Sequence, residues 1–288
     1  MTITDLNKKS KSEVENLLST CCGASKWSQS MCNELPFKDE GHLIQTADRI
    51  WVEGCAESDW QEAFTHHPKI GDIKSLTEKF ASTQHLAGKE QSGVDTAAAD
   101  VIASLAIANQ QYELKFGFIF IVCATGKSAM EMLQLLNDRL KNSKEEELLI
   151  AMGEQQKITL IRLKQLLSNA DWSKYSASQI TTHVLDTSTG IPGKNISIQL
   201  KKEKDHKWIT IAQGITNADG RISDLLPASR KLTNGNYQMV FNTGDYFTQN
   251  KVKGFYPTVE IQFTVFDQSH YHVPLLINPF GYSTYRGS

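Results

Sequence analysis

The chain has 288 residues, which is long enough for one large domain or two of ordinary size. Hydrophobic residues make up 40% and charged residues 22%, the balance of a soluble globular protein. A net charge of -2 gives no electrostatic reason to expect nucleic acid or an anionic membrane as a partner, so the composition favours a small-molecule ligand.

Cysteine usage and targeting signals point to an intracellular protein. The five cysteines all fall in the first half, without the C-x-x-C spacing of a zinc or redox site: Cys21, Cys22, Cys32, Cys55 and Cys123. Reduced thiols are typical of the cytoplasm, and no signal peptide or membrane-spanning run is recognisable. We expect a cytoplasmic location. A peroxisomal one stays open, because Arg162-Leu163 followed by Asn169-Ala170 approaches an internal targeting pattern.

The first half has helical periodicity. Ser12 and Glu15 have the spacing of a capping box, as do Ser128 and Glu131, and apolar residues follow each pair at helical intervals. Residues 144–167 begin with acidic and end with basic side chains, which complements a helix dipole. The amphipathic pattern predicts an all-α domain over residues 1–168.

The pattern changes after a short polar stretch, residues 169–178, which we interpret as a linker. Alternating β-branched runs then occur at 195–201, 208–216, 237–242, 259–267 and 273–278, separated by turn residues. Short strands at this spacing predict an all-β antiparallel sandwich over residues 179–288.

Four motifs of the second half carry polar chemistry: Thr182-His183-Val184-Leu185-Asp186, Asp219-Gly220-Arg221, His270-Tyr271-His272-Val273-Pro274-Leu275 and the terminal Tyr285-Arg286-Gly287-Ser288. Singly, each has an ordinary structural interpretation, such as a half-buried strand histidine or a disordered tail. In this order they resemble the 5-hydroxyisourate hydrolases, enzymatic relatives of transthyretin, and the resemblance implies the transthyretin-like sandwich topology.

The hydrolase resemblance implies a role for each matching residue. His183 and His272 would supply the base and the proton relay, and Arg221 would hold the substrate ring. Tyr285, Arg286 and Ser288 would close the site, with Ser288 counted as catalytic. His270 shares a strand face with His272, but only His272 directly precedes Val-Pro-Leu, so His270 is expected to act indirectly at most.

The first half has its own motifs: residues 65–72, which contain His66, His67 and Pro68; residues 88–91; residues 115–124; and residues 137–140. Together they resemble the 2-oxo-4-hydroxy-4-carboxy-5-ureidoimidazoline (OHCU) decarboxylases. The resemblance implies that His67 is the acid-base residue and Glu90 its partner. Substrate-binding residues would be Pro68, Gln91, Arg139 and the segment Phe120, Ile121, Val122, Cys123 and Ala124.

The two resemblances together imply a bifunctional enzyme of urate catabolism. Its second half would hydrolyse 5-hydroxyisourate, and its first half would decarboxylate the ureidoimidazoline product to (S)-allantoin, without a cofactor or a metal. The families imply a homo-oligomer, with dimer contacts through the helical domain and tetramer contacts through the sandwich. The alternative is a ligand-binding or partner-binding module in which one half or neither is active.

Overall fold

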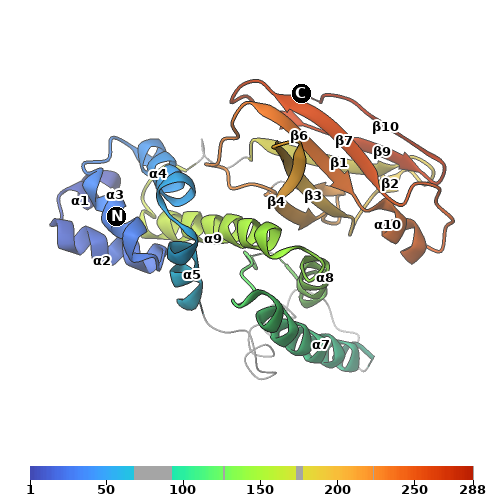
Figure 1. Cartoon of the computed structure of the whole chain (residues 1–288), viewed down its shortest axis with the longest axis horizontal. Coiled ribbons are helices and arrows are strands. Elements are labelled where there is room, and N and C mark those ends of the chain that lie inside the picture. Colours follow the sequence, from blue (N-terminus) through green and yellow to red (C-terminus); the bar gives the residue numbers. More distant parts are fainter. Residues whose placement is uncertain (68–92, 126, 173–177, 223, 288) are drawn as a thin grey trace.

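The computed structural model describes residues 1–67, 93–125, 127–172, 178–222 and 224–287. A helical half and a β-sandwich half lie side by side, and the helix α9 (Lys144–Leu166) runs beneath the sandwich (Figure 1). The other helices of the first half are α1 (Ile3–Asn7), α2 (Lys11–Cys21), α3 (Ser25–Asn33), α4 (Glu40–Arg49), α5 (Glu57–Thr65), α7 (Gly93–Phe116) and α8 (Ala129–Arg139), with one π-helical turn, η1 (Ile50–Gly54). The predicted order, a helical half followed by a β-sandwich, is confirmed.

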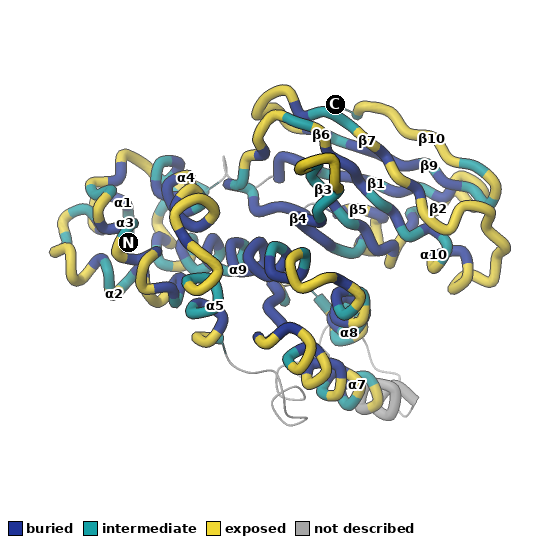
Figure 2. Tube along the Cα trace, in the orientation of Figure 1, coloured by how far each residue is buried: buried dark blue, intermediate teal, exposed yellow. Residues whose placement is uncertain are grey.

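The helix α9 is buried over most of its circumference (Figure 2). One part of it packs on α2 and the π-helical turn, where the Trp51 indole N–H donates to the Met152 carbonyl at 3.0 Å. Another part packs on strand β4 (Lys207–Ile215) of the sandwich. A helix in this position joins the two halves and can carry residues that serve both.

Capping boxes mark the starts of α2 and α8, but the start of α2 differs from the prediction. Ser128 and Glu131 cap α8 as predicted. The first long helix, α2, is capped by Ser10 and Glu13, so the prediction from Ser12 and Glu15 was wrong by two residues. Both pairs have the same S-x-x-E spacing, and spacing alone does not distinguish them.

Two apolar cores support the helical half. One lies among α1 to α5 and includes Trp27, whose indole N–H donates to the Ala47 carbonyl at 3.0 Å. The other lies among α7, α8 and the segment after α7, where Tyr112 packs edge-on against Phe118 and Phe120. The second core therefore fixes the start of the segment 120–124.

The sandwich has two sheets around one core. One has the strand order β4-β3-β6-β7, with β3 (Ser197–Lys204), β6 (Gly235–Phe241) and β7 (Val259–Val265). The other has the order β10-β9-β1-β2, with β1 (Ile180–Asp186), β2 (Ile191–Pro192), β9 (Leu275–Asn278) and β10 (Gly281–Thr284). The short strands β5 (Arg221–Ile222) and β8 (Tyr271–His272) also pair with β1.

Two features of the sandwich were not predicted. The pairing is antiparallel except that β1 runs parallel to β8 and to β9. A short helix, α10 (Thr243–Gln249), follows β6 and buries Tyr246 and Phe247. Among the helices that the structure describes, none is long and apolar enough to cross a membrane.

Candidate active sites

Strand β1 brings the predicted hydrolase residues of three separate segments together. His183 on β1 lies opposite Arg221 of β5, and Thr181 on β1 lies opposite His272 of β8. Thr181 and His183 are two residues apart and therefore face the same side of the sheet. Arg221 and His183 each lower the pKa of His272, so the three side chains lie close enough to interact electrostatically.

The turn before Arg221 explains why this position needs glycine. Gly220 has φ +70°, and a Cβ atom there would lie only 2.3 Å from the Val184 carbonyl oxygen. The Gly220 carbonyl accepts from the Val184 amide at 2.8 Å. The Asn217 side-chain oxygen closes the turn by accepting from the Arg221 amide at 2.9 Å. Close approach of the bare glycine backbone to β1 therefore sets Arg221 opposite His183.

A hydrogen-bonded chain sets the tautomer of His272. His270 Nδ1 lies 3.1 Å from the Ser178 carbonyl, which can only accept, so Nδ1 carries the hydrogen. In neutral His270, Nε2 is then an acceptor and receives the Thr181 hydroxyl hydrogen at 3.0 Å. The Thr181 oxygen in turn accepts from His272 Nδ1 at 2.9 Å. This assignment leaves Nε2 of His272 with a lone pair, the state that a general base requires.

Burial and neighbouring charge keep both histidines neutral. Partial burial lowers the pKa of His183, and the Arg221 guanidinium lowers it further. Burial likewise lowers the pKa of His272, with additional contributions from Arg221, His270 and His183. Both imidazoles can therefore accept a proton at neutral pH.

The C-terminal tail lies along His272. The Gly287 amide donates to the His272 carbonyl at 2.9 Å, and a Cβ atom on Gly287 would lie 2.5 Å from the imidazole Cδ2. The Arg286 guanidinium lies 5.2 Å from the centre of the Tyr271 ring. Tyr285 and Arg286 line a cavity of about 340 Å³ together with His272. Ser288 lies outside the described residues, so its predicted role stays a prediction.

In the helical half, His67 contacts the central helix. Its Nε2 lies 2.5 Å from Oε1 of Gln155, a fully buried residue of α9. The Gln155 amide nitrogen donates to Thr159 at 3.2 Å, which fixes Oε1 toward His67. Because Oε1 can only accept, Nε2 of His67 carries a hydrogen. Pro68, Glu90 and Gln91 lie outside the described residues.

The segment 120–124 is held by buried polar groups at its backbone. The Cys123 amide donates to the Glu154 carboxylate at 2.7 Å, and the Ile121 carbonyl accepts from Arg139 at 2.8 Å. Phe120, Ile121, Val122 and Cys123 are buried, and Ala124 is partly exposed.

Arg139 is 1% exposed and is paired with Glu147, whose carboxylate lies 2.7 Å from Arg139 Nε. Tyr112 and Asn142 also hydrogen-bond to this carboxylate. Arg139 therefore supports the lining segment from behind, and its contact with substrate stays a prediction.

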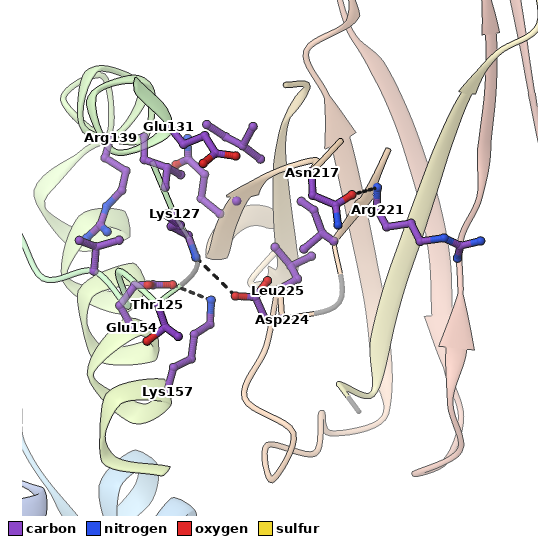
Figure 3. A pocket seen from close by; sticks show the side chains of 16 residues that line it. Thr125, Lys127, Glu131, Arg139, Glu154, Lys157, Asn217, Arg221, Asp224 and Leu225 are labelled. Atoms are coloured by element: carbon purple, nitrogen blue, oxygen red, sulfur yellow. Dashed lines mark hydrogen bonds and ion pairs between the residues drawn. The ribbon is translucent and has the colours of Figure 1, made fainter. Parts of the chain in front are cut away.

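A further cavity, of about 270 Å³, lies between the two halves (Figure 3). Val122 borders it on one side and Arg221 on the other, but the Arg221 side chain points away from it. Lys127 of the helical half pairs with Asp224 of the sandwich at 3.5 Å. The segment before Lys127 and the strand that carries Arg221 are thus linked through one ion pair.

Two positioning residues were missed in the sequence. Gln155 lies in a run of polar residues in the middle of α9, of which Glu154, Gln155 and Gln156 are buried, and that run was the available signal. Thr181 precedes His183 by two residues, so strand alternation alone could have placed it on the same face. Among the described residues, no group of three or more His, Cys, Asp or Glu side chains could hold a metal ion.

Comparisons with known proteins match both halves. The OHCU decarboxylase model matches residues 7–164, and the HIUase/Transthyretin family model matches residues 180–287. The uric acid degradation bifunctional protein TTL of Arabidopsis thaliana is 32% identical, over 93% of this chain and 96% of its own length. The 5-hydroxyisourate hydrolase of Mesorhizobium japonicum is 43% identical, over 41% of this chain and 99% of its own.

Among solved structures, an (S)-allantoin synthase aligns over 100% of both chains at 24% identity, with a TM-score of 0.45. The family assignment rests on the sequence relatives and on the two family models. From these matches along both halves, the chain belongs to the family of bifunctional uric acid degradation proteins, in which an OHCU decarboxylase region precedes a HIUase/transthyretin domain.

Proposed function

We propose that this enzyme converts 5-hydroxyisourate to (S)-allantoin in two steps, hydrolysis by the sandwich and decarboxylation by the helical half. The observation that carries the proposal is the match of one chain to both family models and, over 93% of its length, to a bifunctional relative. The division into residues 1–168, a linker 169–178 and residues 179–288 is part of the proposal.

In the hydrolytic step, His272 Nε2 would take a proton from water as the water oxygen adds to the lactam carbonyl. The lactam C–N bond then breaks, and the proton passes to the departing ring nitrogen. Arg221 would hydrogen-bond the carbonyl oxygen as negative charge develops on it. His183, with its lowered pKa and its place opposite Arg221, would relay the proton.

In the second step, the carboxylate of the intermediate would leave as carbon dioxide. The electron pair left on the ring carbon is delocalised into the adjacent C=N and carbonyl system, which is why the proposal includes no cofactor. His67 would then deliver a proton from Nδ1 to one face of that carbon, since Gln155 occupies Nε2. Delivery to one face would give the S product. Glu90, Gln91 and Pro68 complete the proposed site.

We also propose an oligomer built on the exposed side of the hydrolase site. Phe266 and Tyr285 are 68% and 60% exposed beside the cavity that contains His272. Exposed aromatic residues at a site of this kind are typical of an interface. Light scattering of the purified chain tests the assembly, and a monomer at micromolar concentration would contradict it.

We place the protein in the cytoplasm, because all five cysteines are buried free thiols, as in a reducing compartment. Fluorescence microscopy of the full-length protein tests this location. Accumulation in peroxisomes would favour the alternative.

Two single variants test whether each half of the chain catalyses its own step. His67→Ala should hydrolyse 5-hydroxyisourate normally and accumulate the carboxylated ureidoimidazoline. His272→Ala should be slow in hydrolysis but should decarboxylate the ureidoimidazoline at the wild-type rate when that compound is supplied. If the wild-type chain lacked one step, it would have one active half, and if it lacked both, a binding module would be favoured. A folded variant that keeps the step assigned to its histidine would contradict that assignment.

A further inference from the structure

A cavity of about 350 Å³ lies where α4, α9 and the loop Ser229–Thr233 of the sandwich meet. Asp48 of α4, Gln156 of α9 and Arg230 of the loop line it. His67, His183 and His272 do not, so this cavity is separate from both proposed active sites. Its walls come from both halves of the chain.

Four buried polar atoms around this cavity lack a hydrogen-bond partner within the described part of the chain: Asp48 Oδ2, Gln156 Oε1, Ser229 Oγ and Arg230 Nη1. The Gln156 amide nitrogen donates to Asp48 Oδ1 at 2.8 Å. A carboxylate can only accept, so this contact fixes the nitrogen and leaves the Gln156 oxygen as an acceptor. Ser229 lies close enough to Asp48 to lower the pKa that burial raises, although the two side chains do not reach hydrogen-bond distance. Buried polar groups are normally satisfied, so four atoms without a full hydrogen bond around one cavity indicate room for an occupant.

The helix α9 has a glycine where Arg230 approaches it. Arg230 Nη1 lies 3.6 Å from the position that a Cβ atom on Gly153 would take, an ordinary contact distance, so the guanidinium packs against α9. No carboxylate of the described residues lies within ion-pair distance of Arg230, although Asp48 contributes to the local field. Arg230 is partly exposed, but its Nη1 atom is buried and has no partner, and such a cation attracts an anion.

The remaining charges of the wall agree with an anionic occupant. Arg49, Lys202 and Lys231 also line the cavity, whereas Glu53 is the other carboxylate besides Asp48. Arg49 is already paired with Glu34 at 2.9 Å, whereas Arg230 has a buried Nη1 atom without a partner. Burial raises the pKa of Asp48 to about 6, so this carboxyl is still mainly an acceptor at neutral pH.

The unpaired atoms also determine which hydrogen-bond donors and acceptors the anion must have. Arg230 Nη1 needs an acceptor, which any oxyanion supplies. Asp48 Oδ2 and Gln156 Oε1 need donors, which acetate lacks at neutral pH and which phosphate supplies only through its P–OH groups. A ureido group or a cyclic imide supplies N–H donors beside its carbonyl or carboxylate oxygens.

We infer that this inter-domain cavity binds a small anion that carries N–H donors, of the ureido-carboxylate or cyclic-imide class, at a site distinct from both active sites. The oxyanion contacts Arg230, and the N–H groups contact Asp48 and Gln156. Because its walls come from both halves, an occupied cavity holds the helical half and the sandwich together. The inference does not depend on the proposed reaction.

Calorimetry and thermal unfolding of the full chain test this site with three probes: allantoate, a ureido carboxylate; orotate, a cyclic-imide carboxylate; and inorganic phosphate. We expect one binding event with allantoate, orotate or both, and a rise in Tm of roughly 5 °C at a hundredfold excess over Kd. Binding of allantoate would identify the ligand as a ureido carboxylate, and binding of orotate would identify it as a cyclic imide. Phosphate should bind more weakly than the organic anion and should raise Tm less.

Arg230→Met should weaken this event at least tenfold, and Lys253→Met, which removes the same charge from an exposed loop, should leave it unchanged. Asp48→Asn should also weaken binding, and it keeps the Arg230 guanidinium. It is the variant to measure if Arg230→Met does not fold. Equal binding by phosphate, no binding by either organic anion, or undiminished binding in the Asp48 and Arg230 variants would overturn the inference.

Discussion

Gly220→Ala is expected to slow hydrolysis of 5-hydroxyisourate by about a hundredfold. The new Cβ atom would lie 2.3 Å from the Val184 carbonyl oxygen and 3.1 Å from the Gly193 amide nitrogen. Restoring an ordinary contact distance requires the turn to retreat from β1 by roughly 1 Å. The next residue, Arg221, moves with it, and a displacement of about 1 Å in a positioning group can cost about 10²-fold in rate.

Gly190→Ala is the matched control, because Gly190 has nearly the same backbone angle, φ +71°, with nothing within 4 Å of its Cβ position. Both variants carry the cost of alanine in the left-handed region, about 1–2 kcal/mol. Only Gly220→Ala adds the clash beside Arg221.

The assay follows ultraviolet absorbance of freshly generated 5-hydroxyisourate, with decarboxylation of supplied ureidoimidazoline measured on the same preparations. Decarboxylation should be unchanged in both variants. If Gly220→Ala hydrolysed within twofold of Gly190→Ala, the turn would not position Arg221 and this part of the reasoning would be refuted.

Three further variants test the groups that hold the histidines. Gln155→Leu removes the acceptor from His67 Nε2 and should slow decarboxylation by about tenfold or more, with hydrolysis unchanged. Thr181→Val breaks the chain to His272 Nδ1 and should slow hydrolysis by about tenfold, with decarboxylation unchanged. Arg221→Gln removes a cation that lowers the pKa of His272, so that pKa should rise in a histidine titration followed by NMR.

Each of these outcomes can fail separately. Equal loss of both activities in Gln155→Leu would indicate unfolding of α9, which circular dichroism would reveal. An unchanged hydrolysis rate in Thr181→Val would show that the tautomer of His272 is set by other contacts. A pKa of His272 that stays the same or falls in Arg221→Gln would contradict the electrostatic environment described for the three side chains.

Helices and strands with strong periodicity were predictable, because local pattern reports local structure. The strands at Lys207–Ile215 and Val259–Val265 fall where alternation indicated them. The pairing of β1 with β8 was not predictable, since a strand of two residues has no period to detect. The turn at Asp219–Arg221 was recognised from its residue types, but the contact of Gly220 with β1 depends on the tertiary structure.

The sequence identified the candidate residues of the hydrolase site, but not the residues that hold them in position. His183, Arg221 and His272 were identified through a family resemblance, and strand pairing brings them together. Arg139 shows the opposite case. Its side chain hydrogen-bonds to Glu147 and to the Ile121 carbonyl, contacts that the sequence did not indicate, and its predicted contact with substrate stays a prediction. Such hydrogen bonds and ion pairs join residues that are distant in the sequence, and no local pattern predicts them.

The most direct test of the account is circular dichroism of the allantoin that forms when the purified chain receives freshly generated 5-hydroxyisourate, with ultraviolet absorbance recorded in parallel. The account predicts enzyme-dependent loss of 5-hydroxyisourate, transient ureidoimidazoline and a final dichroic signal of the S enantiomer. Racemic allantoin formed at the spontaneous rate would contradict it.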